Sequence, residues 1–153
     1  LFGDWIKYWW LKTVFDFALL YSQHTFIFLT KQPQNLAKWS PFPDNCWVGM
    51  TVTRDGIGNS SAGAIPCFED IEARVKFISF EPLLEPISFH YYSDFVNWLI
   101  IGSQTQPVKH PPREWVTEII SVADKAGIPV FVKSPMAEHF GINRKEFPVS
   151  PLV

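Results

Sequence analysis

The sequence has few cysteines, little charge and no long apolar run. Cys46 and Cys67 are the only cysteines in 153 residues, and they stand too far apart for a CxxC motif. A disulfide framework is therefore not expected, and a reducing, cytoplasmic setting fits best. No uncharged apolar stretch approaches the roughly 18 residues of a transmembrane helix, and the first residues lack the architecture of a signal peptide. We therefore expect no membrane partner.

An excess of positive charge is also missing. Charged residues make up 18% of the chain and the formal net charge is −2, so the balance does not indicate a nucleic-acid partner. The histidines show no metal-binding spacing among themselves or with the cysteines, so no metal ligand is predicted. They are His24, His90, His110 and His139. The chain begins at Leu1 within a helix-like segment, which suggests a piece of a longer protein.

Apolar residues are plentiful at 47% of the chain, and five short runs of them are expected to be strands. Most of these runs are continuously apolar, as is typical of parallel strands covered on both faces. The seven tryptophans are expected mainly in the core, with stacking on nucleic-acid bases as the alternative. The predicted strands are residues 24–30, 46–52, 75–80, 98–102 and 130–133.

Two segments carry helical patterns. The first begins at Asp4 as a capping residue and runs toward Tyr21, with an apolar stripe expected to be buried. The second starts with Pro111 and Pro112 and is stopped by Gly127 with Pro129. The expected stripe of the first is Trp10, Val14, Phe17 and Tyr21, and that of the second is Trp115, Ile119, Val122 and Ala126.

These elements predict an α/β fold in which parallel strands alternate with helices. The sheet is either open and doubly wound or a partial (β/α) barrel, because a complete eight-unit barrel needs about 250 residues. We assign residues 1–136 to the partial barrel domain and residues 137–153 to a C-terminal extension. An incomplete barrel leaves unpaired strand edges, and such edges favour self-association.

Polar residues follow the predicted strands, and the carboxyl ends of parallel strands meet at one edge of a sheet. This edge is therefore the predicted site, and ordinary solvated loop residues are the alternative. The set is Thr30, Lys31, Thr51, Thr53, Ser79, Glu81, Ser103, Gln104, Thr105, Lys133 and Ser134.

Three of these residues are the catalytic candidates. Lys31 and Lys133 directly follow apolar strands, where a lysine can pair with a phosphate or carboxylate or, if desolvated, form a Schiff base. Glu81 can bind a hydroxyl or amine or act as a base. The alternative for Glu81 is a salt bridge to Lys31 or Lys133.

Several blocks of the sequence resemble the phage-associated three-cysteine-motif family of unknown function, which is similar to radical S-adenosylmethionine (SAM) enzymes. The resemblance runs in order from Leu1 to about Lys133. Its blocks are Leu1-Phe2-Gly3, His24-Thr25-Phe26, Leu29-Thr30-Lys31-Gln32-Pro33, residues 45–52, residues 77–87 with Glu81-Pro82-Leu83-Leu84, residues 97–102 and residues 126–133.

The resemblance implies a barrel-like fold and a particular chemistry. Three cysteines upstream of this chain would hold a [4Fe–4S] cluster, which cleaves SAM to a 5′-deoxyadenosyl radical. This chain would then form a wall of the cavity for SAM and an unknown small-molecule substrate. The implied contacts are Thr30, Thr51, Ser103 and Gln104 for the cofactor, with Glu81, Lys133 and Lys31 as catalytic groups.

Two departures from the family pattern accompany the missing cysteines. The family reads Gly-Gly-Glu-Ser-Gly-Pro where residues 102–107 read Gly-Ser-Gln-Thr-Gln-Pro, and it reads Gln-Trp where Ser134-Pro135 stands. The chain alone is therefore expected to be inactive as a radical enzyme. Two other functions remain open, namely a lyase that uses a strand-end lysine as a Schiff base and a non-catalytic remnant that binds a partner.

Overall fold

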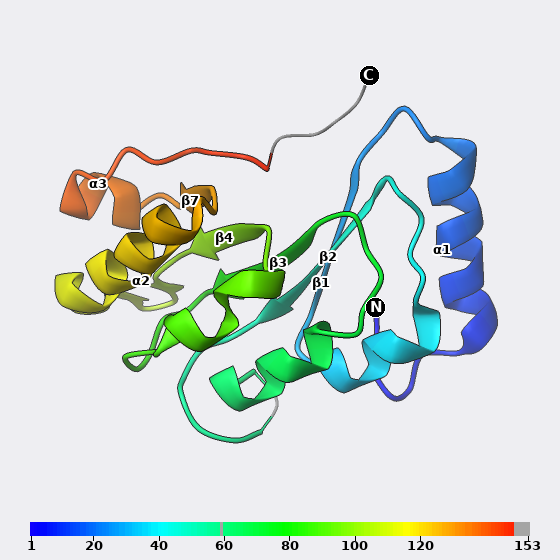
Figure 1. The fold of residues 1–153 in the computed structure, drawn as a ribbon, viewed down its shortest axis with the longest axis horizontal. Helices are drawn as coiled ribbons and strands as arrows, with labels where there is room; N and C mark the ends of the chain where they lie inside the picture. Colours follow the sequence, from blue (N-terminus) through cyan, green and yellow to red (C-terminus); the bar gives the residue numbers. More distant parts are fainter. Residues whose placement is uncertain (59, 149–153) are drawn as a thin grey trace.

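A five-stranded parallel sheet runs through the centre of the protein (Figure 1). The computed structural model describes residues 1–58 and 60–148. The strands lie side by side in chain order and every neighbouring pair is parallel. They are β1 (Phe26–Thr30), β2 (Cys46–Thr51), β3 (Lys76–Phe80), β4 (Trp98–Ile101) and β7 (Val130–Val132). Each predicted run forms one strand, which confirms the α/β fold with parallel strands.

Helical segments occupy the connections between these strands. Three of the connections are short 3-10 helices, and the fourth contains a small antiparallel hairpin followed by a long helix. The expected partial (β/α) barrel stays a prediction, because the sheet of the described residues is not closed. The helices are α1 (Tyr8–Leu20), η1 (Pro33–Trp39), η2 (Ala62–Phe68), η3 (Phe89–Phe95), α2 (Arg113–Ala126) and α3 (Met136–Phe140), and the hairpin joins β5 (Gln104–Thr105) to β6 (Val108–Lys109).

All of these helices pack against the same face of the sheet. Alternate strand residues, such as Val48 and Met50 of β2, share one hydrophobic cluster with buried residues from every helix. Those helical residues are Leu11, Leu36, Ile65, Phe89, Val116 and Met136. Because strand side chains alternate between faces, the other half of the strand residues points away from the helices.

We call that opposite side of the sheet the inner face. Its core is aromatic: Trp98 lies 5.8 Å from Trp47 and 5.4 Å from Phe77 between ring centroids. A Cβ at Gly49 would overlap the Phe77 ring, so only glycine fits on β2 beneath it. This aromatic layer lies at the amino-terminal half of the strands, and it leaves the carboxyl ends to smaller and polar side chains.

The start of α1 and its buried stripe were predicted wrongly. The helix begins after Lys7 rather than at Asp4, because the Asp4 carboxylate accepts hydrogen bonds from Gln32 and Asn35 instead. The buried residues of α1 are Leu11 and Ala18. The predicted stripe is mostly exposed, with Trp10, Phe17 and Tyr21 showing 51%, 54% and 41% of their surface.

The tryptophan prediction holds in part. Trp47 and Trp98 are buried, whereas Trp5, Trp9 and Trp10 are exposed.

No helix in the described part of the chain has the length and apolar character needed to span a membrane.

The bounds of α2 were predicted more accurately than those of α1. The helix begins after Pro112 and ends at Gly127, whose φ of 68° is the left-handed conformation that glycine adopts easily. The predicted stripe is confirmed in part, because Ile119 is buried and Trp115 and Val122 are half-buried against the core. Ala126 is exposed, and Val116 and Ala123 are buried although the pattern did not predict them.

The residues after α3 return along the free edge of β7. The amide of Val132 donates to the carbonyl of Arg144, and the amide of Glu146 donates to the carbonyl of Val130. Phe147 then places its ring 5.4 Å from Trp98 on the inner face. The part of the expected C-terminal extension described by the structure thus adds an antiparallel segment to the sheet, and residues 149–153 lie outside the described residues.

Candidate functional site

The inner face becomes polar at the carboxyl ends of the strands. Thr51 of β2 and Ser79 of β3 are buried side by side as register partners. Glu81 follows β3 and Lys133 follows β7. Each stands an even number of residues after an inner-face residue of its strand, so each side chain belongs to the inner face. The predicted edge therefore brings together Thr51, Ser79, Glu81 and Lys133.

Glu81 and Lys133 form an ion pair at this edge. Lys133 Nζ lies 2.6 Å from Glu81 Oε2, and the side chains are 44% and 23% exposed. The salt bridge considered as an alternative for Glu81 is therefore present, and its partner is Lys133 rather than Lys31. Because β4 lies between β3 and β7, the pair spans two strand spacings, or about 10 Å. Only long side chains bridge that distance.

Gly102 makes room for this bridge. It directly follows β4, and a Cβ built on it would lie 2.7 Å from Glu81 Oε1. The Glu81 side chain therefore lies across the backbone of Gly102 on its way to Lys133. The amide of Gly102 donates to the carbonyl of Phe80 and the amide of Lys133 donates to the carbonyl of Ile101, so the backbone beneath the ion pair is fixed by the sheet.

Thr30 and Lys31 are not brought to the ion pair. Thr30 is buried on the helix side of β1, where its hydroxyl accepts a hydrogen bond from the amide of Gln32. Its role there is to shape the turn into η1. Lys31 is exposed at the end of the edge strand.

Ser103 and Gln104 lie in a second polar cluster beyond β4. Ser103 is buried, and its Oγ lies 2.7 Å from His110 Nδ1. The His110 ring stacks on that of His139, with centroids 4.0 Å apart and an interplanar angle of 9°. Gln104 belongs to the β5–β6 hairpin, where its amide nitrogen bonds the carbonyl of Gln106. Sequence spacing did not reveal the His110–His139 stack, because the two residues come from separate elements.

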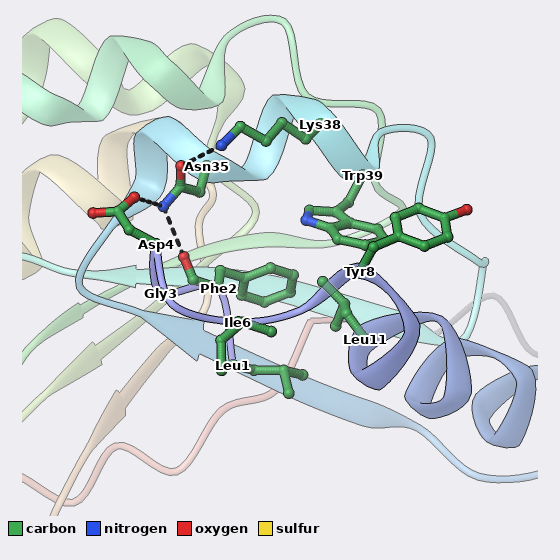
Figure 2. Close-up of a pocket in the computed structure, with 10 residues that line it drawn as sticks. All are labelled: Leu1, Phe2, Gly3, Asp4, Ile6, Tyr8, Leu11, Asn35, Lys38 and Trp39. Carbon is green, nitrogen blue, oxygen red and sulfur yellow. Dashed lines mark hydrogen bonds between the residues drawn. The ribbon is translucent and has the colours of Figure 1, made fainter.

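A cavity of about 230 Å³ lies between the N-terminal segment, α1 and η1 (Figure 2). Its polar side is a network around Asn35, which donates to the Phe2 carbonyl at 2.9 Å and to Asp4 Oδ1 at 2.7 Å. Lys38 Nζ donates to Asn35 Oδ1 at 3.0 Å. Because the polar groups of Asn35 already bond the chain itself, this network holds the N-terminal segment in place. Tyr8 and Trp39 stack at the opposite wall.

A family model described as "Protein of unknown function (DUF5131)" matches residues 1–142. The chain belongs to this family. No curated protein and no solved structure matches the chain. The DUF5131 match covers all five parallel strands and both members of the Glu81–Lys133 pair. The phage association and the similarity to radical SAM enzymes stay predictions from the resemblance.

The described residues of this DUF5131 chain do not fit an iron–sulfur cluster. Cluster ligands are thiolates, but Cys46 is buried on the helix side of β2, and burial raises the pKa of its thiol to about 11. Cys67 lies in η2, and no group of three or more His, Cys, Asp or Glu side chains gathers as a metal site among the described residues.

The charged groups of the edge, by contrast, suit a zwitterionic ligand. A carboxylate beside an ammonium group is the complement of a ligand that carries one group of each kind. Glu81 and Lys133 supply one of each, and Thr51 and Ser79 add hydroxyl groups.

Proposed function

We propose that this DUF5131 chain forms one wall of a cavity that binds SAM and a small-molecule substrate, with the Glu81–Lys133 pair as its polar anchor. The observation that carries the proposal is the half-buried ion pair at the carboxyl end of a parallel sheet, where α/β proteins commonly bind ligands. The resemblance to radical SAM relatives supplies the choice of SAM. Since cluster ligands do not fit among the described residues, the proposal for this chain is limited to binding.

Each residue of the edge has a definite task in this proposal. Glu81 accepts hydrogen bonds from the ligand's ammonium group, and Lys133 donates to its carboxylate. The ion pair is partly exposed, so exchanging it for ligand contacts costs little. The aromatic layer of Phe77 and Trp98 closes the inner face below and keeps water away from that side, which strengthens electrostatic contacts above it.

The proposed contact set is smaller than the sequence suggested. Thr51 and Ser79 stand on the inner face as register partners on β2 and β3, and Ser79 lies two residues before Glu81 on the same face. Thr30 faces the helices, and Ser103 bonds His110. We therefore place Thr30, Ser103 and Gln104 outside the direct contacts.

Calorimetric titration of SAM into the chain tests this function. Glu81→Gln and Lys133→Gln should each weaken binding by about tenfold or more, because each removes a hydrogen bond to a charged group. Asp16→Asn is the matched control, since it breaks the exposed Lys12–Asp16 ion pair of α1 without touching the edge. S-adenosylhomocysteine and methionine, titrated in parallel, show which half of SAM is bound. The absence of binding, or equal weakening by the control, would falsify the proposal.

A lyase that uses Lys133 as a Schiff base receives less support. The nucleophile in that chemistry is a neutral, desolvated amine, whereas Lys133 is paired to a carboxylate and 44% exposed. Lys31 is exposed as well. Borohydride reduction in the presence of small aldehydes and keto acids separates the two functions, because a covalent adduct on either lysine would favour the lyase.

A further inference from the structure

Two hydroxyl groups at the carboxyl edge lie deep in the sheet without a hydrogen-bond partner. Thr51 of β2 and Ser79 of β3 are only 3% and 1% exposed, yet no hydrogen bond joins either hydroxyl to another group of the described residues. Within the same residues, every fully buried side-chain nitrogen or oxygen does have a partner. The small exposed part of Thr51 and of Ser79 therefore includes the hydroxyl oxygen, which is open to the inner face.

The strand register adds a lysine to this pair. Thr51 and Ser79 are partners across β2 and β3, about 4.8 Å apart as neighbouring strands are. The register of β1 with β2 runs to Thr30, and one position further Lys31 comes level with Thr51. Lys31 stands two residues after Leu29, which alternates with the helix-side residues of β1 and so belongs to the inner face. We call Lys31, Thr51 and Ser79 the donor row.

The donor row is built to meet a negatively charged oxygen. The side chain of Lys31 is exposed, and no ion pair joins its ammonium group to a carboxylate of the described residues. An ammonium group offers three N–H donors and no acceptor, and each hydroxyl offers one further donor. Hydrogen bonds of this kind are strongest when the acceptor is ionised. An oxyanion is therefore the ligand group that uses the whole row.

The carboxylate of Glu81 does not oppose an anion in the donor row. Its side chain crosses the backbone of Gly102 toward β7, and its charge is matched by Lys133 at 2.6 Å. The ion pair thus extends from β3 toward β7, whereas the donor row extends from β3 toward β1. The two sets of groups occupy different halves of the inner face, and each half is free to hold a ligand of its own.

We propose that the donor row binds a phosphate group, so that the substrate of this cavity is a phosphorylated small molecule. The inference rests on the proposed function, because it places the substrate beside the Glu81–Lys133 pair. A phosphate group presents three strong acceptor oxygens in different directions, whereas a carboxylate presents two in one plane. Donors from three side chains on three strands fit the phosphate better. Beyond Ser79 the row continues with Ile100 of β4, which has no donor and marks the limit of the phosphate site.

Titration of inorganic phosphate, followed by two-dimensional amide NMR spectra at constant ionic strength, tests the donor row. The amide signals of Lys31, Thr51 and Ser79 should shift along one saturable curve. Lys31→Gln and Thr51→Val should each raise the dissociation constant about fivefold or more, because each removes a hydrogen bond to a charged group. Lys125→Gln and Thr117→Val are the matched controls, since both residues are exposed on α2, which packs on the opposite face of the sheet. Equal weakening by the controls would overturn the proposal.

The stability of the variants separates binding from a structural role. The hydroxyl of Thr51 bonds no group of the described chain, so Thr51→Val should leave the free energy of unfolding unchanged or raise it. Ser79→Ala should behave in the same way. Weaker phosphate binding by variants that are as stable as the unsubstituted chain would support the proposal. A clear loss of stability in both variants would overturn it, because the hydroxyls would then have partners within the chain.

A comparison of ligands keeps this inference separate from the proposed function. Glu81→Gln should weaken SAM binding and leave phosphate binding intact, whereas Lys31→Gln should weaken phosphate binding and leave SAM binding intact. SAM binding without phosphate binding would overturn the donor row and leave the SAM anchor in place. Phosphate binding without SAM binding would support the donor row and contradict the proposed function. Acetate is the second probe, and equal affinity for acetate would overturn the choice of phosphate.

Discussion

Two glycines of the sheet lie beneath other side chains. Gly49 matters for the stability of the fold, and Gly102 matters for the Glu81–Lys133 ion pair. Gly49 lies under the ring of Phe77 in the aromatic layer, and Gly102 lies under the carboxylate of Glu81. A methyl group at either position meets an atom that must move. The ring of Phe77 is fully buried and held by Trp98, whereas the carboxylate is the end of a flexible side chain.

For Gly49→Ala we expect a loss of about 1–3 kcal/mol in the free energy of unfolding, because the overpacked ring has no free space. Urea unfolding followed by circular dichroism measures it. The same substitution should cost less in a Phe77→Leu background, since the smaller side chain leaves room for the methyl group. Additive effects of the two substitutions would show that Gly49 acts through something other than Phe77.

Gly102→Ala should leave stability almost unchanged and disrupt the ion pair. The added methyl group displaces Glu81 Oε1, and Lys133 loses its partner. Amine-directed labelling of Lys133 should therefore increase, and SAM binding should weaken about as much as in Glu81→Gln. Unchanged labelling would mean that Glu81 reaches Lys133 by another path, whatever the outcome of the binding experiment.

At the scale of elements, the sequence predicted α2 and the strands well because their signals agree. Pro112, the apolar period and Gly127 all indicate the same helix, and the strands are short apolar runs between polar ends. The limits of α1 were harder to predict because its sequence carries two apolar stripes, and a period alone does not say which stripe meets the sheet.

The sequence predicted that the site lies at the carboxyl edge of the sheet, and it predicted some of the residues that gather there. Counting alternate positions from Phe77 places Ser79 and Glu81 on one face, and the same count along β7 places Lys133 there. The count also sets Thr30 and Ser103 on the other face. The contacts of Asp4 with Gln32 and of His110 with His139 join residues about 30 positions apart, and no local pattern encodes such pairs.

At the scale of the whole molecule, the two edges of the sheet differ in whether another segment pairs with them. The β1 edge is open, whereas the β7 edge is closed by the segment around Arg144 and Glu146. Arg144 bonds Glu146 and also Asp124 of α2 at 2.8 Å. Glu146 further accepts the amide of Val130 at 2.9 Å. We call Arg144, Glu146 and Asp124 the C-terminal clamp.

The clamp should make closure of the β7 edge depend on pH. The hydrogen bond from Arg144, followed by the bond from the Val130 amide, lowers the pKa of Glu146 below its ordinary value of 4.5. A lowered pKa in the folded state means that the stabilisation is complete above pH 4.5 and is lost as the pH falls through the lower folded value. Because the carboxylate is 41% exposed, solvent screening limits the effect to about 1 kcal/mol.

Glu146→Gln should therefore be less stable than the unsubstituted chain at neutral pH, and the difference should shrink below pH 4.5. Urea unfolding followed by circular dichroism at a series of pH values measures it. Glu118→Gln, an exposed change on the same α2 that supplies Asp124, is the control. A pH-independent difference for Glu146→Gln would mean that the clamp acts through packing of Phe147 rather than through charge.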